Sequence, residues 1–506
     1  MKMQNKENSA RTNVLTSVFL SLLFAGLPLI FTNGFFNITQ TKAVFFYILA
    51  TAFIVVFIFM LPDGKTGNAE LKSKFAPPYS CVDIAFMCFF FFVLVAGILS
   101  EYRNDVWIGA AARYQGVLTI LLYTLMYFAV SRNLQKPNAF LLCAVVVFSV
   151  VCLFGVCNCF DIDLLGLHDR LSDRQKGAYI STIGNINFYS SYLCLLLPLV
   201  LCGFIQATNK TSRIIYTVSL LIGSFGIMVT ASESFALGLS VAVAVIPLFL
   251  KDDTKKLKRY LVGIVMVILS SQLYMLLYNR AEVRHVPLSE ALQLFTNPYV
   301  AAVLTAVCAV VYILLCVCPK IIKKGIFVYA FLLCAAVIAI CVCFVLSNTK
   351  GLGSLDAYFR ITDEWGSKRG EIWKQCLTLF KGFSLKEKLF GIGPEALQRI
   401  SDGSAVFAGK VLDQAHNEYL QYLLTTGICG FVAYLSIPVT ITFTVAKYLR
   451  RNTLAVGLFA GLAAYWLQAT VNIAQPFTTP LMYGYIAILG GIAWNTKKEF
   501  LLQKEQ

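Results

Sequence analysis

The sequence predicts an all-α, polytopic integral membrane protein with about 12–14 transmembrane helices. Two observations lead to this fold class. Of the 506 residues, 58% are hydrophobic and only 13% are charged, and apolar runs of about 18–23 residues recur along the chain. Each run is long enough to cross a hydrocarbon core of roughly 30 Å. We therefore expect residues 1–506 to form a single integral membrane domain.

Fourteen apolar segments are candidate transmembrane helices, and a long polar loop separates the eleventh from the twelfth. No small-residue cleavage site follows the first segment, so we expect it to be retained. Segments 214–230 and 235–250 are short and adjacent, which suggests a helical hairpin. The fourteen segments are 13–32, 41–61, 81–100, 115–131, 139–158, 186–206, 214–230, 235–250, 260–278, 300–318, 325–347, 422–445, 454–471 and 481–495.

The distribution of basic residues orients these segments independently of their hydropathy. If the N-terminus is cytoplasmic, 24 of the 42 Lys and Arg residues fall in the cytoplasmic segments and eight in the short external ones. The other ten lie in the long loop, about 348–415, and long loops are exempt from the positive-inside rule. We therefore expect a multi-pass cell-membrane protein with both termini cytoplasmic and this loop extracytoplasmic. The net charge of +16 then reflects topology and anionic lipid headgroups, without a nucleic-acid partner.

Neither the cysteines nor the paired acids predict a metal site or a cofactor. Nearly all of the 16 cysteines fall inside the candidate segments, where a thiol acts as a small apolar group. Asp161 and Asp163 have the D-x-D spacing that binds metal in many nucleotide-sugar transferases. Two acids at this spacing in a loop are common by chance, so we expect no metal there.

All three histidines fall on the expected extracytoplasmic side. Several polar residues that are hard to explain as parts of solvated loops lie on the same side. Each has a simpler interpretation by itself. Arg113 can snorkel, and Asn185 and Asn187 can cap a helix. Glu233 can be an interfacial charge. Their concentration on one face favours a substrate site, with candidate binding residues Arg113, Arg170, Arg174, Asn185, Asn187, Glu233, Asn417 and Tyr419.

The long loop is expected to contain an interfacial helix over residues 367–381. A broad apolar face that includes Trp373 would lie along the membrane surface, with the indole at headgroup depth. Arg369 lies four residues before Trp373, so both side chains point the same way. An arginine in the first turn of a helix forms an anion site, and its planar fork fits a phosphate group. The alternative is that Arg369 snorkels to a lipid phosphate.

His416 is the candidate catalytic base. Asp413 is a plausible N-cap, which would place His416 in the first helical turn and on one face with Tyr419. Asp413 or Glu418 could orient the imidazole, which titrates nearest to neutral pH. The alternative is an interfacial histidine that faces the lipid headgroups.

The expected compartment narrows the chemistry. Outside the cytoplasm there is normally no nucleotide sugar to draw on, so an enzyme there needs a donor that is already activated and delivered by the membrane. A lipid diphosphate meets this requirement, because arginines at the headgroup plane can hold its charge. A hydroxyl acceptor would then need a base.

The same residues resemble the O-antigen ligase/polymerase family of bacterial membrane glycosyltransferases. The most specific match is His416-Asn417-Glu418-Tyr419-Leu420 followed by Thr426-Gly427-Ile428-Cys429-Gly430, which is similar to the H-N-x-[YF]-L…G-x-x-G signature. Arg369-(x3)-Trp373 and Phe390-Gly391-Ile392-Gly393-Pro394 are similar to the preceding segment. Weaker matches are Arg113-Tyr-Gln-Gly116 and Gly184-Asn185-Ile186-Asn187-Phe188. The resemblance is sharp over about 365–435 and diffuse over about 110–250.

The resemblance implies a GT-C-like enzyme that transfers a glycan from a polyprenyl-diphosphate carrier to an acceptor hydroxyl, without metal and with inversion. It implies that His416 is the base and that Arg369 holds the diphosphate. The acceptor would be a glycan, a lipid or a protein. One departure matters: Glu233 stands where the family often has arginine, so Arg170, Arg174, Lys176 or Arg113 would have to take over that contact. Fourteen spans also exceed the family's expected twelve, and 260–278 with 300–318 could be the extra pair.

Two alternatives stay open at this point. A surface-polysaccharide polymerase has the same chemistry, with another lipid-linked glycan as acceptor. A lipid-linked glycan flippase or other transporter is a different class, and would be expected to show charges and broken helices near the membrane midplane. The interiors of the candidate spans are nearly free of charge, which favours the enzyme.

Overall fold

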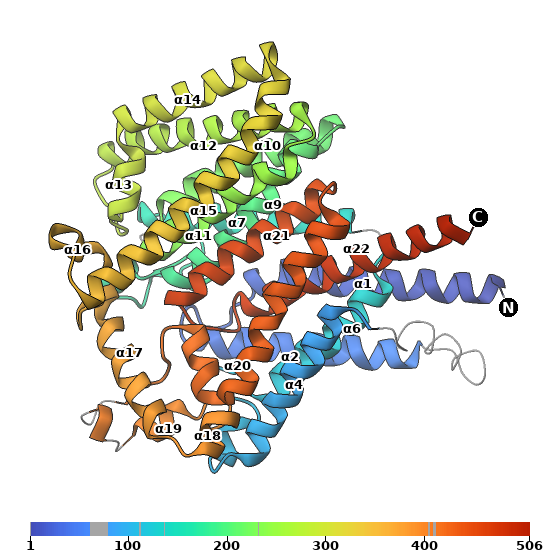
Figure 1. Ribbon diagram of the computed structural model, residues 1–506, viewed down its shortest axis with the longest axis vertical. Coiled ribbons are helices and arrows are strands. Elements are labelled where there is room, and N and C mark those ends of the chain that lie inside the picture. The colour runs from blue at the N-terminus through green and yellow to red at the C-terminus, as the bar shows by residue number, and fades with distance from the viewer. Residues whose placement is uncertain are drawn as a thin grey trace.

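The computed structural model describes residues 2–60, 79–110, 113–135, 137–230, 232–402, 405–407 and 411–505. It is almost entirely helical (Figure 1). The first half contains α1 (Lys2–Leu29), α2 (Ile38–Phe59), α4 (Cys81–Leu99), α5 (Arg103–Val106), α6 (Val117–Asn133), α7 (Asn138–Cys159), α8 (Asp173–Lys176), α9 (Ile186–Gln206), α10 (Lys210–Met228), α11 (Glu233–Leu250) and α12 (Thr254–Arg280). Between α8 and α9, β1 (Tyr179–Ile180) pairs antiparallel with β2 (Gly184–Asn185).

The second half contains a long insertion between two long helices. Its helices are α13 (Glu290–Thr296), α14 (Pro298–Val317), α15 (Pro319–Thr349), α16 (Asp356–Phe359), α17 (Trp365–Gly382), α18 (Leu385–Phe390), α19 (Leu397–Ser401), α20 (Glu418–Thr444), α21 (Thr453–Gln468) and α22 (Thr479–Glu505). A π-helical turn, Val445–Leu449, continues α20, and 3-10 turns lie at Gly353–Leu355, Ala405–Phe407 and Ala469–Val471.

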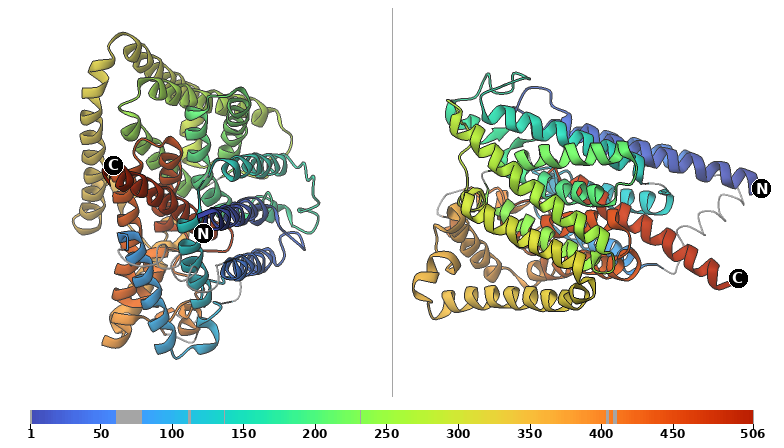
Figure 2. Two further views of the ribbon diagram at one scale, coloured as in Figure 1. Left: turned by 90° about the vertical axis from the view of Figure 1, so that its right-hand side faces the viewer. Right: turned by 90° about the horizontal axis from the view of Figure 1, so that it is seen from above.

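The prediction of an all-α polytopic membrane protein is confirmed. Within the described residues, 12 helices are long and apolar enough to cross a membrane by length and composition. The other two predicted spans are also helices: α6 is shorter, and α22 continues beyond its apolar part into Lys497 and Lys498. Both termini lie at one end of the helices, and the loop helices α16 to α19 lie toward the other end (Figure 2).

Helix α9 lies at the centre of the bundle, where it packs against α21, α10 and α11. Its Tyr189 and Tyr192 are fully buried. Helices α20 and α4 pack together, and α22 packs on α6. By contrast, α14 and α15 lie at the periphery and are mostly exposed, as an apolar helix surrounded by lipid would be (Figure 1).

The suggested hairpin of residues 214–230 and 235–250 is wrong. Helix α10 packs mainly against α7, α9 and α12, whereas α11 packs mainly against α21, α9 and α12. Their short connection therefore does not decide which helix each one contacts.

The long loop between α15 and α20 docks on the segment that joins α4 to α6. The hydroxyl of Ser100 donates to the carbonyl of Ile392 at 2.6 Å, and Arg399 Nε donates to Asp105 Oδ2 at 2.5 Å. These contacts, together with the apolar cluster around Cys376 and Leu424, hold the loop against the end of the bundle.

Two glycines allow the loop to join α20 through its backbone. Gly427 interrupts α20 with φ 67°, and the amides of Ile392 and Gly393 donate to the carbonyls of Leu424 and Thr425 at 3.1 and 2.9 Å. A Cβ on Gly391, which has φ 79°, would lie 2.3 Å from the Thr425 backbone. Such a close approach requires glycine. The stretches around Gly391 and Gly427 therefore lie side by side in the structure.

Candidate functional site

The candidate site is built at the start of α20, where His416 precedes the helix. Asn417 is the N-cap, because its side-chain oxygen accepts from the Leu420 amide at 3.0 Å. His416 has φ 49°, in the left-handed region, and is therefore outside the helix. The expectation that Asp413 caps the helix and that His416 lies in its first turn is wrong, because asparagine is among the best caps and lies closer to the helix.

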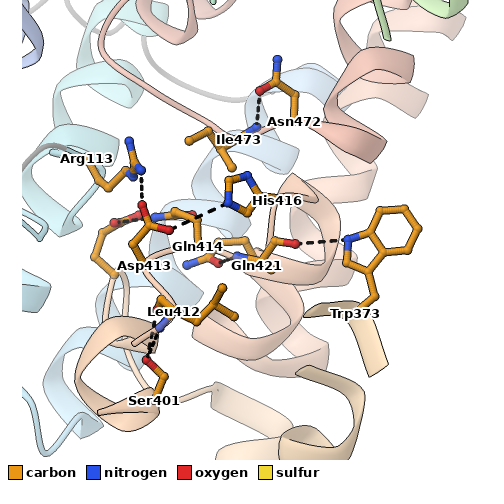
Figure 3. A network of polar contacts seen from close by, with 12 residues as sticks. Arg113, Trp373, Ser401, Leu412, Asp413, Gln414, His416, Gln421, Asn472 and Ile473 are labelled. Carbon is orange, nitrogen blue, oxygen red and sulfur yellow. Dashed lines mark hydrogen bonds and ion pairs between the residues drawn. The ribbon is translucent and has the colours of Figure 1, made fainter. Parts of the chain in front are cut away.

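The segment before His416 is fixed by contacts from three directions (Figure 3). The amide of Ala415 donates to Gln421 Oε1 at 3.0 Å, and its carbonyl accepts from Trp373 Nε1 at 3.1 Å. The Ser401 hydroxyl accepts from the Leu412 amide at 2.9 Å. The indole of Trp373 thus bonds within the protein, although the sequence predicted a headgroup anchor.

His416 is held next to a carboxylate but stays partly accessible. Its Nε2 lies 3.9 Å from Asp413 Oδ1, and 36% of its side chain is exposed. Burial lowers the pKa of His416, Asp413 raises it, and Arg369 and Arg113 lower it again. The net direction is downward, so the imidazole is neutral at neutral pH and able to accept a proton.

Arg113 reaches this loop from the segment between α4 and α6. Its guanidinium forms an ion pair with Asp413 Oδ2, while the other carboxylate oxygen faces His416 (Figure 3). Asp413 therefore links the arginine to the histidine, and the structure brings together residues 300 positions apart in sequence.

Arg369 is the second cation whose charge acts on His416. The first turn of α17 is irregular, since Gly366, Ser367 and Lys368 all have positive φ. This turn lets Arg369 Nη1 donate to the Gly366 carbonyl at 2.8 Å. Burial lowers the pKa of Arg369, and its buried Nε has no hydrogen-bond partner among the described residues.

A buried carboxyl that the sequence did not single out lies behind the loop. Glu395 is 5% exposed and accepts from Gln414 Nε2 at 2.7 Å. Burial raises its pKa to about 7, while Gln414 and Arg113 lower it and Asp413 raises it. The only signal was its position directly after the Gly391–Pro394 turn, and a single acid in a loop carries little information.

Glu418 does not orient His416, as the sequence had suggested as one option. It is 1% exposed and accepts hydrogen bonds from Tyr434 at 2.6 Å and Tyr465 at 3.2 Å, inside the bundle. The hydroxyl of Tyr419 likewise donates to the Trp466 carbonyl at 2.7 Å. Both residues fix α20 against α21.

The two asparagines of the weaker motif belong to a neighbouring polar network. Asn185 caps α9 by accepting from the Asn187 amide at 2.9 Å. The Asn187 side chain accepts from Ser232 at 3.3 Å, and its carbonyl accepts from Asn472 at 3.4 Å. Ala474, two residues on, lines the same small cavity as Gln414, Glu395 and Gln421, so this network adjoins the segment that carries His416.

Arg170, Arg174 and Glu233 make other contacts. Arg170 donates to the Asn33 side chain at 3.0 Å, and Arg174 lies in the short helix α8. Glu233 accepts from the Ala291 amide at 3.3 Å. Among the described contacts, Glu233 pairs with neither arginine.

The D-x-D pair serves the local structure. Asp161 Oδ1 lies 2.7 Å from His285 Nε2, and Asp163 accepts from the His168 amide at 2.6 Å. A hydrogen bond from His285 lowers the pKa of Asp161. Within the described residues, no group of three or more His, Cys, Asp and Glu side chains is arranged to hold a metal ion.

One family model matches the part of the chain that carries this loop. The family model described as O-antigen ligase matches residues 292–435, which include Arg369, Glu395, Asp413 and His416. No curated protein matches the sequence. The matched segment extends from α13 to the first two thirds of α20 and thus contains the docked loop. Residues 292–435 therefore form a segment that matches the O-antigen ligase family, within a chain that has many apolar helices.

Proposed function

We propose that the protein transfers a glycan from a polyprenyl-diphosphate carrier to an acceptor hydroxyl at the extracytoplasmic face of the membrane. One observation carries the proposal: a histidine with a lowered pKa lies beside Asp413 and within the field of two arginines, at the end of the bundle opposite the termini. A neutral base with adjacent cations is what a hydroxyl acceptor and a diphosphate leaving group require.

The proposed reaction assigns a role to each of these groups. His416 Nε2 faces Asp413, which leaves Nδ1 to accept the proton of the acceptor hydroxyl. The acceptor oxygen then bonds to the anomeric carbon as the bond from that carbon to the diphosphate oxygen breaks, with inversion. Arg369 and Arg113 hold the diphosphate and stabilise the charge that it gains. This transfer needs no metal ion.

Removal of the base provides the test. Purified protein is mixed with a polyprenyl-diphosphate glycan and a glycan acceptor, and product is measured for wild type and His416→Ala. We expect transfer to fall by roughly 10²–10⁴-fold, the usual contribution of general base catalysis. His285→Ala is the matched control, because His285 pairs with Asp161 away from the site. Transfer by His416→Ala at the control's rate would exclude His416 as the base.

A further inference from the structure

A second cleft lies at the opposite end of the bundle from His416. It has a volume of about 480 Å³ and lies between the beginning of α4, the end of α6, the end of α20 and the C-terminal half of α22. His416 precedes the beginning of α20, whereas Lys447 lies in the π-helical turn that follows its end. The length of α20, 27 residues, therefore separates the two regions.

The cleft is basic. Its lining residues include Arg132, Lys447 and Lys497, and none of the described residues that line it is a carboxylate. Arg132 is buried and neutralised by Asp83 at 2.6 Å, with its guanidinium 4.2 Å from the ring of Trp494. The two lysines thus supply the net charge, and both are exposed on the cleft rim. Lys447 and Lys497 are therefore the groups in the cleft that would attract an anionic ligand.

The cleft is also amphipathic along its length. Val439 and Phe443 lie one to two turns before Lys447 on α20 and line its apolar part. Tyr448 and Trp494 line the part near the lysines, and such aromatic side chains are typical of the membrane interface. An anionic head beside an apolar tail matches this order of side chains, whereas a free phosphate ion would leave Val439 and Phe443 without a partner.

We propose that this cleft is a binding site for an anionic phospholipid, with the phosphate between Lys447 and Lys497 and an acyl chain along α20. Basic pockets between transmembrane helices bind anionic headgroups in this way. The π-helical turn Val445–Leu449 supports the assignment, because such turns occur frequently at functional sites. The proposal is independent of the transfer reaction.

Lipid binding to the purified full-length protein tests the proposal. Phosphatidylglycerol and phosphatidylcholine with the same acyl chains are titrated, and bound lipid is measured by native mass spectrometry. We expect wild type to prefer phosphatidylglycerol. The double variant Lys447→Gln/Lys497→Gln should weaken that binding about 30-fold, roughly fivefold for each lysine. Each single variant should bind phosphatidylglycerol about fivefold more weakly than wild type. The single variants replace the double variant in the test if the latter does not fold.

The matched control is Lys210→Gln/Lys498→Gln. These two lysines are exposed at the same end of the bundle but do not line the cleft, so the control should bind phosphatidylglycerol like wild type. Equal loss in the control and the cleft variants would overturn the proposal. It would also be overturned if wild type bound both lipids equally, or if inorganic phosphate stabilised the protein as much as the lipid did.

Discussion

The hydrogen bond from Trp373 to Ala415 is the contact through which α17 positions His416. Trp373→Phe removes the indole N–H but keeps an aromatic ring in the same place. The 3.1 Å bond to the Ala415 carbonyl is then lost, and this carbonyl belongs to a fully buried residue. A buried acceptor without a partner costs about 1–3 kcal/mol. We therefore expect Trp373→Phe to lower the melting temperature.

The larger effect should be on catalysis. Ala415 directly precedes His416, so the free carbonyl allows the loop to shift the imidazole. A shift of about 1 Å in a catalytic group can cost on the order of 10²-fold in rate. We expect kcat for glycan transfer to fall by about 10–100-fold, while KM for the donor changes much less, because Arg369 and Arg113 stay in place.

The control is Trp365→Phe on the same helix. The ring of Trp365 lies 5.3 Å from that of Trp373, and no described hydrogen bond joins it to residues 411–417. It should keep nearly full kcat. The two variants are compared at equal amounts of folded protein in the reconstituted transfer assay. Equal kcat for Trp373→Phe and Trp365→Phe would refute the positioning role.

Three further predictions follow from the same site. Arg369→Ala should raise KM for the lipid-diphosphate donor by at least tenfold, and Arg369→Lys should restore it only in part, because lysine lacks the bidentate fork. The neighbouring Lys368→Ala should behave like wild type. Equal KM values for all three variants would contradict the role of Arg369 in holding the diphosphate. Burial raises the pKa of Glu395 to about 7, so folding stability should fall as pH rises from about 4.5 to 7. In thermal unfolding scans, Glu395→Gln should remove this loss of stability. The same dependence of melting temperature on pH in Glu395→Gln and wild type would contradict the prediction. A cysteine introduced at Leu385, which is 74% exposed on α18, should react in intact cells with a thiol reagent that cannot cross membranes, and reaction only after permeabilisation would place the loop in the cytoplasm.

The transmembrane helices could be predicted because length and apolar composition decide whether a segment can cross a bilayer. Packing partners could not be predicted in this way. Helices α10 and α11 are adjacent in sequence, yet each packs mainly against other helices. Hydropathy reports that a face is buried but does not specify which helix buries it.

The structure brings together some of the candidate site residues, and their roles stay predictions. His416 and Arg369 were identified from residue chemistry and motif spacing, and Arg113 from its place on the same face. The left-handed conformation of His416 was missed because the sequence analysis placed the N-cap at Asp413, whereas the cap is Asn417. Glu395 was missed because its raised pKa comes from burial, which depends on how the loop folds back against the bundle.

The central claim is that neutral His416 accepts the proton of the acceptor hydroxyl. The most direct measurement is the pH dependence of kcat/KM for transfer by the wild type and by His416→Ala. Burial and the two arginines lower the pKa of His416. The wild-type kcat/KM at about pH 6.5, the ordinary pKa of histidine, should therefore still equal its value at neutral pH. It should then fall tenfold per pH unit at lower pH. His416→Ala should show a low rate without this acidic limb, whereas an acidic limb that persists unchanged in His416→Ala would contradict the claim.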